Sequence, residues 1–141
     1  MAFTGSMADR HAIRELYDTY ADGGSRCCRD TWLSCYADDA RWTSHYFDLQ
    51  GIEAIAATFD AIMTGVAHTK VFTQIGSMEI DGDTANVRMR QDECLFYEDG
   101  RTYELLGKYD DVLVRRDGRW LFKERDYIVI REVQPASQAS P

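Results

Sequence analysis

Arginine and aspartate residues alternate along one strand-like segment in a pattern that could support acid–base chemistry. Arg90 and Asp92 are two residues apart, so on a strand their side chains point to the same side, about 7 Å apart. Asp126 lies in another strand-like run and shares its alternation with Trp120 and Phe122. An arginine held between two carboxylates keeps one of them ionised while the other retains its proton. Such a group would supply a general base and a general acid in one pocket.

The same charged residues also fit a structural role. Arg88, Arg90 and Asp92 could form a solvated charge ladder on the exposed face of a sheet. Glu124 has the same alternation as Asp126 and is an equal candidate for an inward-facing acid. The pattern leaves both roles open, and the orientation of Asp92 and Asp126 decides between them.

Histidines and aromatic residues add further candidates for a pocket. His68 lies at the start of a strand-like run and His45 lies in a shorter one, and either could transfer protons or sit at the surface. Tyrosine hydroxyls are typical polar anchors of apolar ligand cavities. The aromatic candidates, each of which could also be a core residue, are Tyr17, Tyr20, Trp42, Tyr46, Phe72, Tyr97 and Tyr103. His and acidic residues show no metal-ligand spacing and no glycine-rich phosphate loop occurs, so we predict no metal and no cofactor.

Composition narrows the class of partner. The chain has 141 residues, a formal net charge of −8 and 45% hydrophobic residues, and its two prolines are Pro135 and Pro141. One domain of this length can bury its own core. The acidic balance and the lack of a basic run exclude the electrostatic footprint of nucleic-acid binding and disfavour a membrane surface. The four cysteines form no disulfide framework and no apolar leader is present, which predicts a reducing, cytoplasmic setting.

Hydrophobic periodicity places helices first and strands second. Apolar stripes predict helices over 9–22, a short segment from Asp30, and 51–63, with a short strand over 41–47 between the last two. Runs rich in β-branched and aromatic residues, separated by Asp-Gly turns, predict four strands over 68–80, 84–97, 102–115 and 120–133. Helices followed by a hairpin-linked meander indicate an α+β fold with helices packed on one face of a curved antiparallel sheet. We expect residues 1–8 to be disordered or cloning-derived, 9–133 to form the domain, and 134–141 to be a disordered tail.

Four local motifs, in this order, resemble those of the nuclear-transport-factor-2-like superfamily, and within it the SnoaL-like branch. They are the acidic turn at 36–42 (YADDARW), the helix start at 49–55 (LQGIEAI), and the hairpins at 80–85 (IDGDTA) and 116–120 (RDGRW). The resemblance covers about residues 9–133 and implies a cone-shaped barrel made of a curved antiparallel sheet packed against three N-terminal helices. It also implies a homodimer and a cofactor-free enzyme for a small apolar molecule, for example aromatic, terpenoid or polyketide-like. The same fold also serves as a non-catalytic ligand-binding or dimerisation module.

Members of the superfamily imply different catalytic residues in this chain. Scytalone dehydratase and the dehydrochlorinases resemble each other in pairing an Asp with a His. In this sequence those two positions fall on Ser25 and Val71, while Asp22 and His68 each lie three residues earlier. The resemblance therefore implies His68 as a displaced candidate for this type of proton transfer.

The isomerase and hydrolase types match other positions. The resemblance to ketosteroid isomerase implies a role for Tyr20, with Ser44 where that family has its catalytic Asp. The resemblance to limonene epoxide hydrolase implies Arg90, Asp92 and Asp126 as an Arg-Asp-Asp constellation. We rank dehydratase, isomerase or SnoaL-type cyclase chemistry first, epoxide hydrolysis second, and a non-catalytic module third. The predicted catalytic residues are Arg90, Asp92, Asp126, Tyr20 and His68, and the predicted substrate-binding residues are Trp42, His45, Tyr46, Phe72 and Tyr103.

Overall fold

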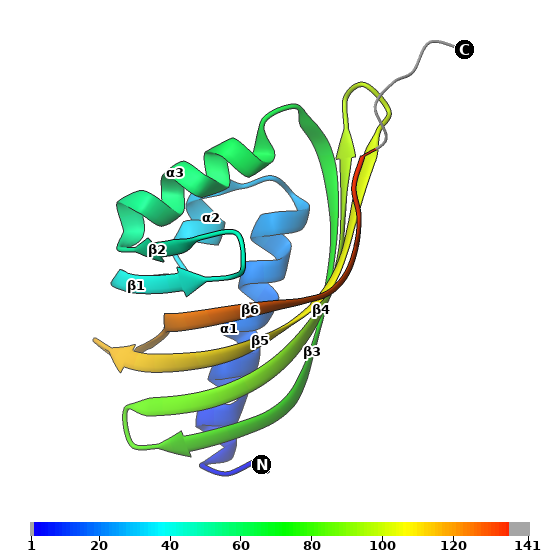
Figure 1. Cartoon of the computed structure of the whole chain (residues 1–141). Coiled ribbons are helices and arrows are strands. Elements are labelled where there is room, and N and C mark those ends of the chain that lie inside the picture. The colour runs from blue at the N-terminus through cyan, green and yellow to red at the C-terminus, as the bar shows by residue number, and fades with distance from the viewer. Residues whose placement is uncertain (1, 136–141) are drawn as a thin grey trace.

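A computed structural model describes residues 2–135, and it has the predicted α+β architecture (Figure 1). Three helices precede or interrupt a six-stranded sheet that curves around the longest helix. The helices are α1 (Met7–Ser25), α2 (Arg29–Leu33) and α3 (Ile52–Met63). The strands are β1 (Tyr36–Thr43), β2 (Asp48–Gln50), β3 (Val66–Asp81), β4 (Thr84–Tyr97), β5 (Thr102–Arg116) and β6 (Arg119–Val133).

Helix α1 fills the concave side of the sheet. Its first turn is capped by the Ser6 hydroxyl, which accepts a hydrogen bond from the Asp9 backbone N–H at 3.0 Å. The apolar stripe of the helix is buried, as its periodicity predicts, with Ile13 and Tyr17 at 0% and 1% exposure. The helix packs against β3 and β6, while α3 covers β1 and β2 at one end of the molecule (Figure 1). One face of the sheet is therefore covered by helices.

The predicted cone-type α+β fold is confirmed, and its curved sheet is mixed and not closed. Its strand order is β2-β1-β6-β5-β4-β3, and β1 runs parallel to β6 while every other neighbouring pair is antiparallel. The three long hairpins occur where the Asp-Gly turns predict them. In the last of these turns Asp117 and Gly118 both have positive φ, at 52° and 75°, as a tight hairpin turn requires.

A β-bulge in β6 decides which of its residues face the helices. Val112 pairs with Glu124 and Leu113 pairs with Phe122, so Lys123 is an extra residue without a partner on β5. The extra residue inverts the alternation, because side chains switch sides at every residue of a regular strand. Phe122 therefore faces the core before the bulge, and Arg125 faces it after the bulge.

The β1 segment differs from expectation. Strand β1 begins at residue 36 instead of 41, because the expected acidic turn is part of the strand. Within it, Asp39 is exposed and forms a salt bridge with Arg116, with 2.7 Å between the carboxylate oxygen and the guanidinium nitrogen. The N-terminal segment contacts the sheet: the Thr4 N–H donates to the Met78 carbonyl at 2.8 Å, next to a parallel bridge from Phe3. Residues 136–141 of the predicted disordered tail lie outside the described residues.

The helices of the described chain are too short or too polar for a bilayer. Within residues 2–135, no helix is both long enough and apolar enough to cross one.

Candidate active site

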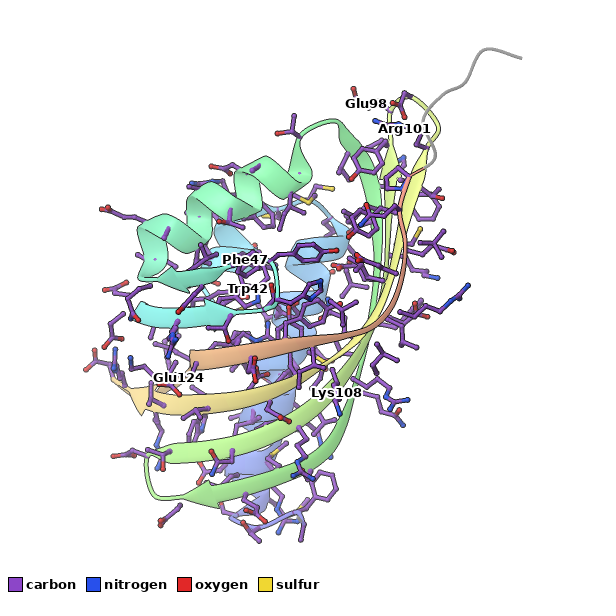
Figure 2. All side chains as sticks on the ribbon, viewed as in Figure 1. Trp42, Phe47, Glu98, Arg101, Lys108 and Glu124 are labelled. Carbon is purple, nitrogen blue, oxygen red and sulfur yellow. The ribbon has the colours of Figure 1, made fainter. Side chains whose placement is uncertain are left out.

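A cavity of about 600 Å³ lies between the helices and the concave face of the sheet. Its wall is mostly aliphatic and aromatic, with contributions from α1, α2, α3 and from strands β1, β3, β4, β5 and β6. A cavity of this size can enclose a small organic molecule. Figure 2 shows Trp42 and Phe47 between α3 and the sheet, and their rings meet edge to face at a centroid distance of 4.7 Å.

Glu93 is the single carboxylic acid among the described residues that line this cavity. It lies on β4, whose inward side carries the odd-numbered residues, including the buried Gln91 and Leu95. Burial raises the pKa of Glu93 from 4.5 to about 7, although a hydrogen bond from Gln91 and the positive charge of Arg125 act in the opposite direction. A pKa near neutrality suits both a general base and a general acid.

A hydrogen bond between two buried polar side chains lies next to Glu93. The Tyr20 hydroxyl on α1 donates to Gln91 Oε1 at 2.8 Å. Gln91 also lowers the pKa of Glu93, against the effect of burial. This contact joins α1 to β4 next to Glu93.

A buried ion pair lies behind this hydrogen bond. The Arg125 guanidinium makes two hydrogen bonds to Asp111, at 2.9 and 3.1 Å, and both side chains are fully buried. Tyr17 donates a further hydrogen bond to Asp111 at 2.6 Å. The guanidinium carbon also lies 3.8 Å from the ring centroid of Tyr109 and 4.5 Å from that of Tyr20. Burial disfavours the charged guanidinium, but Asp111 and the tyrosines outweigh it and raise the pKa of Arg125, so its charge is fixed.

The mouth of the cavity is crossed by a second polar cluster. The Tyr46 hydroxyl from the loop after β1 and the Tyr103 hydroxyl from β5 both donate to the carboxylate of Glu132 on β6. Gln134 Nε2 donates to the Tyr103 oxygen at 3.2 Å. The two phenol hydrogen bonds lower the pKa of Glu132, so it remains a carboxylate. The loop is therefore tied to the end of β6 at the cavity mouth.

Four of the predicted residues line the cavity. They are Tyr20 from α1, Trp42 from β1, Tyr46 from the loop after β1, and Tyr103 from β5. His45 is exposed and is not among the lining residues, and its ring packs against that of Tyr46 with centroids 3.9 Å apart and planes at 38°.

The predicted Arg-Asp-Asp constellation does not assemble in the cavity. Arg90 and Asp92 are exposed on the even-numbered, outer side of β4, where Asp92 lies 4.0 Å from Lys70. The bulge at Lys123 turns Asp126 outward, and it accepts a hydrogen bond from Thr43 at 3.1 Å. These placements correct the expected orientation and remove the geometric support for epoxide hydrolysis by these residues.

The other outward-facing candidates lie away from the cavity. His68 and Phe72 on β3 are exposed, Phe72 by 64%, and Glu124 on β6 is exposed as well. Figure 2 shows Lys108 on the side of the sheet away from the helices, in the same shallow outer groove as Arg90. At the two positions implied by the dehydratase pattern, Ser25 is exposed and Val71 lines the cavity.

Sequence reasoning missed Glu93, Gln91 and Tyr127. A usable signal for the first two exists on β4, because Ala85, Val87 and Met89 place the apolar alternation on odd numbers. Continued along the strand, the same alternation puts Gln91 and Glu93 on the inward side. No comparable signal marks Tyr127, since its orientation depends on the bulge.

The described side chains form no cluster suited to a metal ion. Across residues 2–135, no three His, Cys, Asp or Glu side chains gather in a way that could hold one.

Solved structures of similar shape cover nearly the whole chain. A proposed scytalone dehydratase from Novosphingobium aromaticivorans has a TM-score of 0.83 at 22% identity, covering 95% of this chain and 97% of that one. A proposed aromatic ring hydroxylase from the same organism has a TM-score of 0.85 at 20% identity, with 94% and 96% covered. A hexachlorocyclohexane dehydrochlorinase, LinA type 2, has a TM-score of 0.79 at 20% identity, with 96% and 95% covered. At these identities the likeness establishes the shared fold.

The sequence itself assigns the family. No curated protein matches it significantly. The family model described as a SnoaL-like domain matches residues 5–126, which is most of the chain. That match and the shared fold confirm the resemblance to the nuclear-transport-factor-2-like superfamily, and the chain belongs to the SnoaL-like domain family.

Proposed function

We propose that this protein is a cofactor-free enzyme that transfers protons on a small, largely apolar molecule, with Glu93 as the proton carrier. The observation that carries the proposal is a single carboxyl group, with a pKa near 7, in the wall of an apolar cavity of about 600 Å³. A carboxyl group with a pKa close to the working pH is best suited to taking up and returning a proton.

The proposed step begins with Glu93 in its carboxylate form. The carboxylate takes a proton from an activated C–H bond of the substrate, and the electron pair of that bond moves into the substrate as a new C=C bond or an enolate. In an elimination, the C–O bond to a neighbouring hydroxyl then breaks, and the proton on Glu93 leaves with that oxygen as water. In an isomerisation, the same proton returns to a different carbon.

The surrounding residues support this role. Burial raises the pKa of Glu93, while Gln91 and the buried charge of Arg125 both lower it and so moderate that rise. These opposing effects keep more of the carboxyl group ionised, as a base requires. Among similar structures, the names dehydratase and dehydrochlorinase both describe eliminations, and this favours elimination over isomerisation or cyclisation.

Hydrogen exchange tests the proposal even while the natural substrate is unidentified. The protein is incubated in D₂O with a panel of cyclic and aromatic ketones and hydroxyketones, and deuterium incorporation is followed by mass spectrometry. We expect exchange on at least one compound to exceed the buffer rate and to increase with pH through about 7, as the Glu93 carboxyl ionises. Glu93→Gln should reduce that exchange by roughly 100-fold or more.

A matched control separates the site from the surface. Glu98 lies exposed in the β4–β5 hairpin (Figure 2), so Glu98→Gln makes the same chemical change away from the cavity and should leave exchange unaltered. Equal exchange by wild type and Glu93→Gln would contradict the proposal. Tight binding of a panel member without any exchange would instead support a non-catalytic ligand-binding module.

We also propose that the chain forms a homodimer through the outer face of its sheet. Phe72, Ile128 and Ile130 are large apolar side chains on these strands that are 64%, 37% and 47% exposed. Sedimentation equilibrium tests this proposal, and a monomer at micromolar concentration would contradict it.

A further inference from the structure

The loop between β1 and β2, residues 44–47, forms part of the wall between the cavity and solvent. It contributes Tyr46 and Phe47 to the cavity lining. Tyr46 is nevertheless 54% exposed, so its ring separates the cavity from water. On α3, Ala61 and Ile62 are likewise exposed and also belong to the lining. The opening of the cavity therefore lies between this loop and α3.

The loop is a compact turn at the edge of the sheet. Within it, the Ser44 N–H donates to the Phe47 carbonyl at 2.9 Å, and the Tyr46 N–H donates to the Ser44 hydroxyl oxygen at 3.0 Å. The strand that follows, β2, is an edge strand of three residues that pairs with β1. A turn that is bonded internally and supported from one side can move as a unit once its contact on the other side is released.

That contact is a latch of three side chains, Tyr46, Tyr103 and Glu132. The Tyr46 hydroxyl donates to one carboxylate oxygen of Glu132, and the Tyr103 hydroxyl donates to the other. Gln134 Nε2 donates to the Tyr46 oxygen at 3.5 Å and to the Tyr103 oxygen at 3.2 Å. Hydrogen bonds to an ionised acceptor are stronger than those between neutral groups. The latch thus fastens the loop to β5 and β6 beside the opening.

Exposure to water limits the strength of the latch. Glu132 is half-buried and Gln134 is exposed, in contrast to the fully buried ion pair of Arg125 and Asp111. Water competes for exposed hydrogen bonds, so their net contribution to stability is modest, and contacts of this kind open locally without unfolding of the whole domain. The latch is therefore suited to reversible closure.

We propose that the latch is a gate, and that ligands enter and leave the cavity when the hydrogen bond between Tyr46 and Glu132 opens and the loop moves away from β6. The proposal goes beyond the proposed function, because it concerns access to the cavity and requires no proton transfer by Glu93. It needs only a cavity that takes up a small apolar molecule. Glu132 is a positioning residue here, since it acts through Tyr46 and is not among the lining residues.

Stopped-flow fluorescence with N-phenyl-1-naphthylamine, a neutral dye that brightens in apolar surroundings, tests the gate. The uptake rate constant follows from its dependence on dye concentration, and the release rate constant follows from dilution of the complex. Tyr46→Phe removes the latch hydroxyl and keeps the ring in the cavity wall. Because the gate must open in both directions, we expect both rate constants to rise together, by roughly fivefold to tenfold, while Kd stays within about twofold.

Further variants separate the latch from general effects of substitution. Glu132→Gln keeps an accepting oxygen but loses the charge, so both rate constants should rise by less than in Tyr46→Phe. Combining the two changes should add little to Tyr46→Phe alone, because both act on one hydrogen bond. Tyr97→Phe, under Arg101 at 5.3 Å and outside the lining, and the exposed Glu98→Gln are matched controls that should leave both rate constants unchanged (Figure 2).

The outcomes distinguish a gate from a ligand contact. A rise in the release rate constant alone, with Kd weakened by the same factor, would overturn the gate and would make Tyr46 an ordinary contact residue. Unchanged rate constants in Tyr46→Phe, or a wild type that takes up no dye, would overturn it as well. The fold-change caused by Tyr46→Phe should persist in a Glu93→Gln background, where deuterium exchange is lost, so the gate and the proton transfer succeed or fail independently.

Discussion

The burial of Glu93 makes the stability of the protein depend on pH in a way that Glu93→Gln should abolish. The folded protein raises the pKa of this carboxyl group from 4.5 to about 7, so between these pH values the folded state holds a proton that the unfolded state has lost. The slope of unfolding free energy against pH is then negative. The favourable contribution is complete below pH 4.5, decreases as pH rises toward 7, and is absent above that value.

The size of this effect follows from the same values. At about 1.4 kcal/mol per pKa unit, ionisation of Glu93 costs the folded state about 3 kcal/mol by pH 8. A glutamine side chain cannot ionise, so the variant avoids this loss. Relative to wild type, Glu93→Gln should therefore gain about 3 kcal/mol between pH 4.5 and pH 8, whatever its constant offset at low pH.

Urea denaturation at several pH values measures this difference directly. All variants are compared at one protein concentration, because dissociation of the proposed homodimer contributes to the unfolding free energy, and the midpoint and slope give that free energy at each pH. The exposed Glu98→Gln serves as the matched control and should follow wild type throughout. A difference between wild type and Glu93→Gln that stays constant to within about 0.5 kcal/mol from pH 4.5 to 8 would refute the reasoning.

Other substitutions test the packing that positions the site. Tyr127→Phe removes an unpaired buried hydroxyl and should stabilise the free protein by about 1 kcal/mol in urea denaturation, whereas a loss of stability would reveal an unrecognised partner. Gly107→Ala should lower the free energy of unfolding by about 1–3 kcal/mol, because the new Cβ atom collides with Tyr127. In a Tyr127→Ala background the same change should lower it far less, and a double-mutant cycle measures that difference. Asp111→Asn leaves the buried charge of Arg125 without its carboxylate and should lower the free energy of unfolding by about 3–5 kcal/mol. A decrease of less than about 1 kcal/mol would argue against that ion pair.

The fold was predictable because its signals are local. Alternation with period two and Asp-Gly turns mark the long strands, and the ends of β4 agree with the sequence at both residues 84 and 97. The amphipathic stripe of α1 was equally clear, although the helix extends beyond the predicted range at both ends, to residues 7 and 25. The parallel pairing of β1 with β6 joins segments about 80 residues apart, and nothing in either segment signals it.

The part of the site on β6 was less predictable because a bulge in that strand decides which side chains face inward. The extra residue Lys123 has no distinctive local pattern, yet it turns Asp126 outward and Arg125 and Tyr127 inward. On β4, where no bulge intervenes, Glu93 could have been identified by extending the apolar alternation that precedes it. The rise in the pKa of Glu93 also depends on the packing of helices over the sheet, which adjacent residues do not determine.

The central claim is that Glu93 exchanges its proton near neutral pH inside an apolar cavity. The most direct measurement is a carbon-13 NMR titration of the side-chain carboxyl groups in protein labelled at glutamate, with Glu93→Gln used to assign the resonance. We predict one glutamate resonance that titrates near pH 7 and disappears in the variant. If the resonance lost in the variant titrates below pH 5, Glu93 is an ordinary ionised carboxylate at neutral pH, and its assignment as the acid–base residue is wrong.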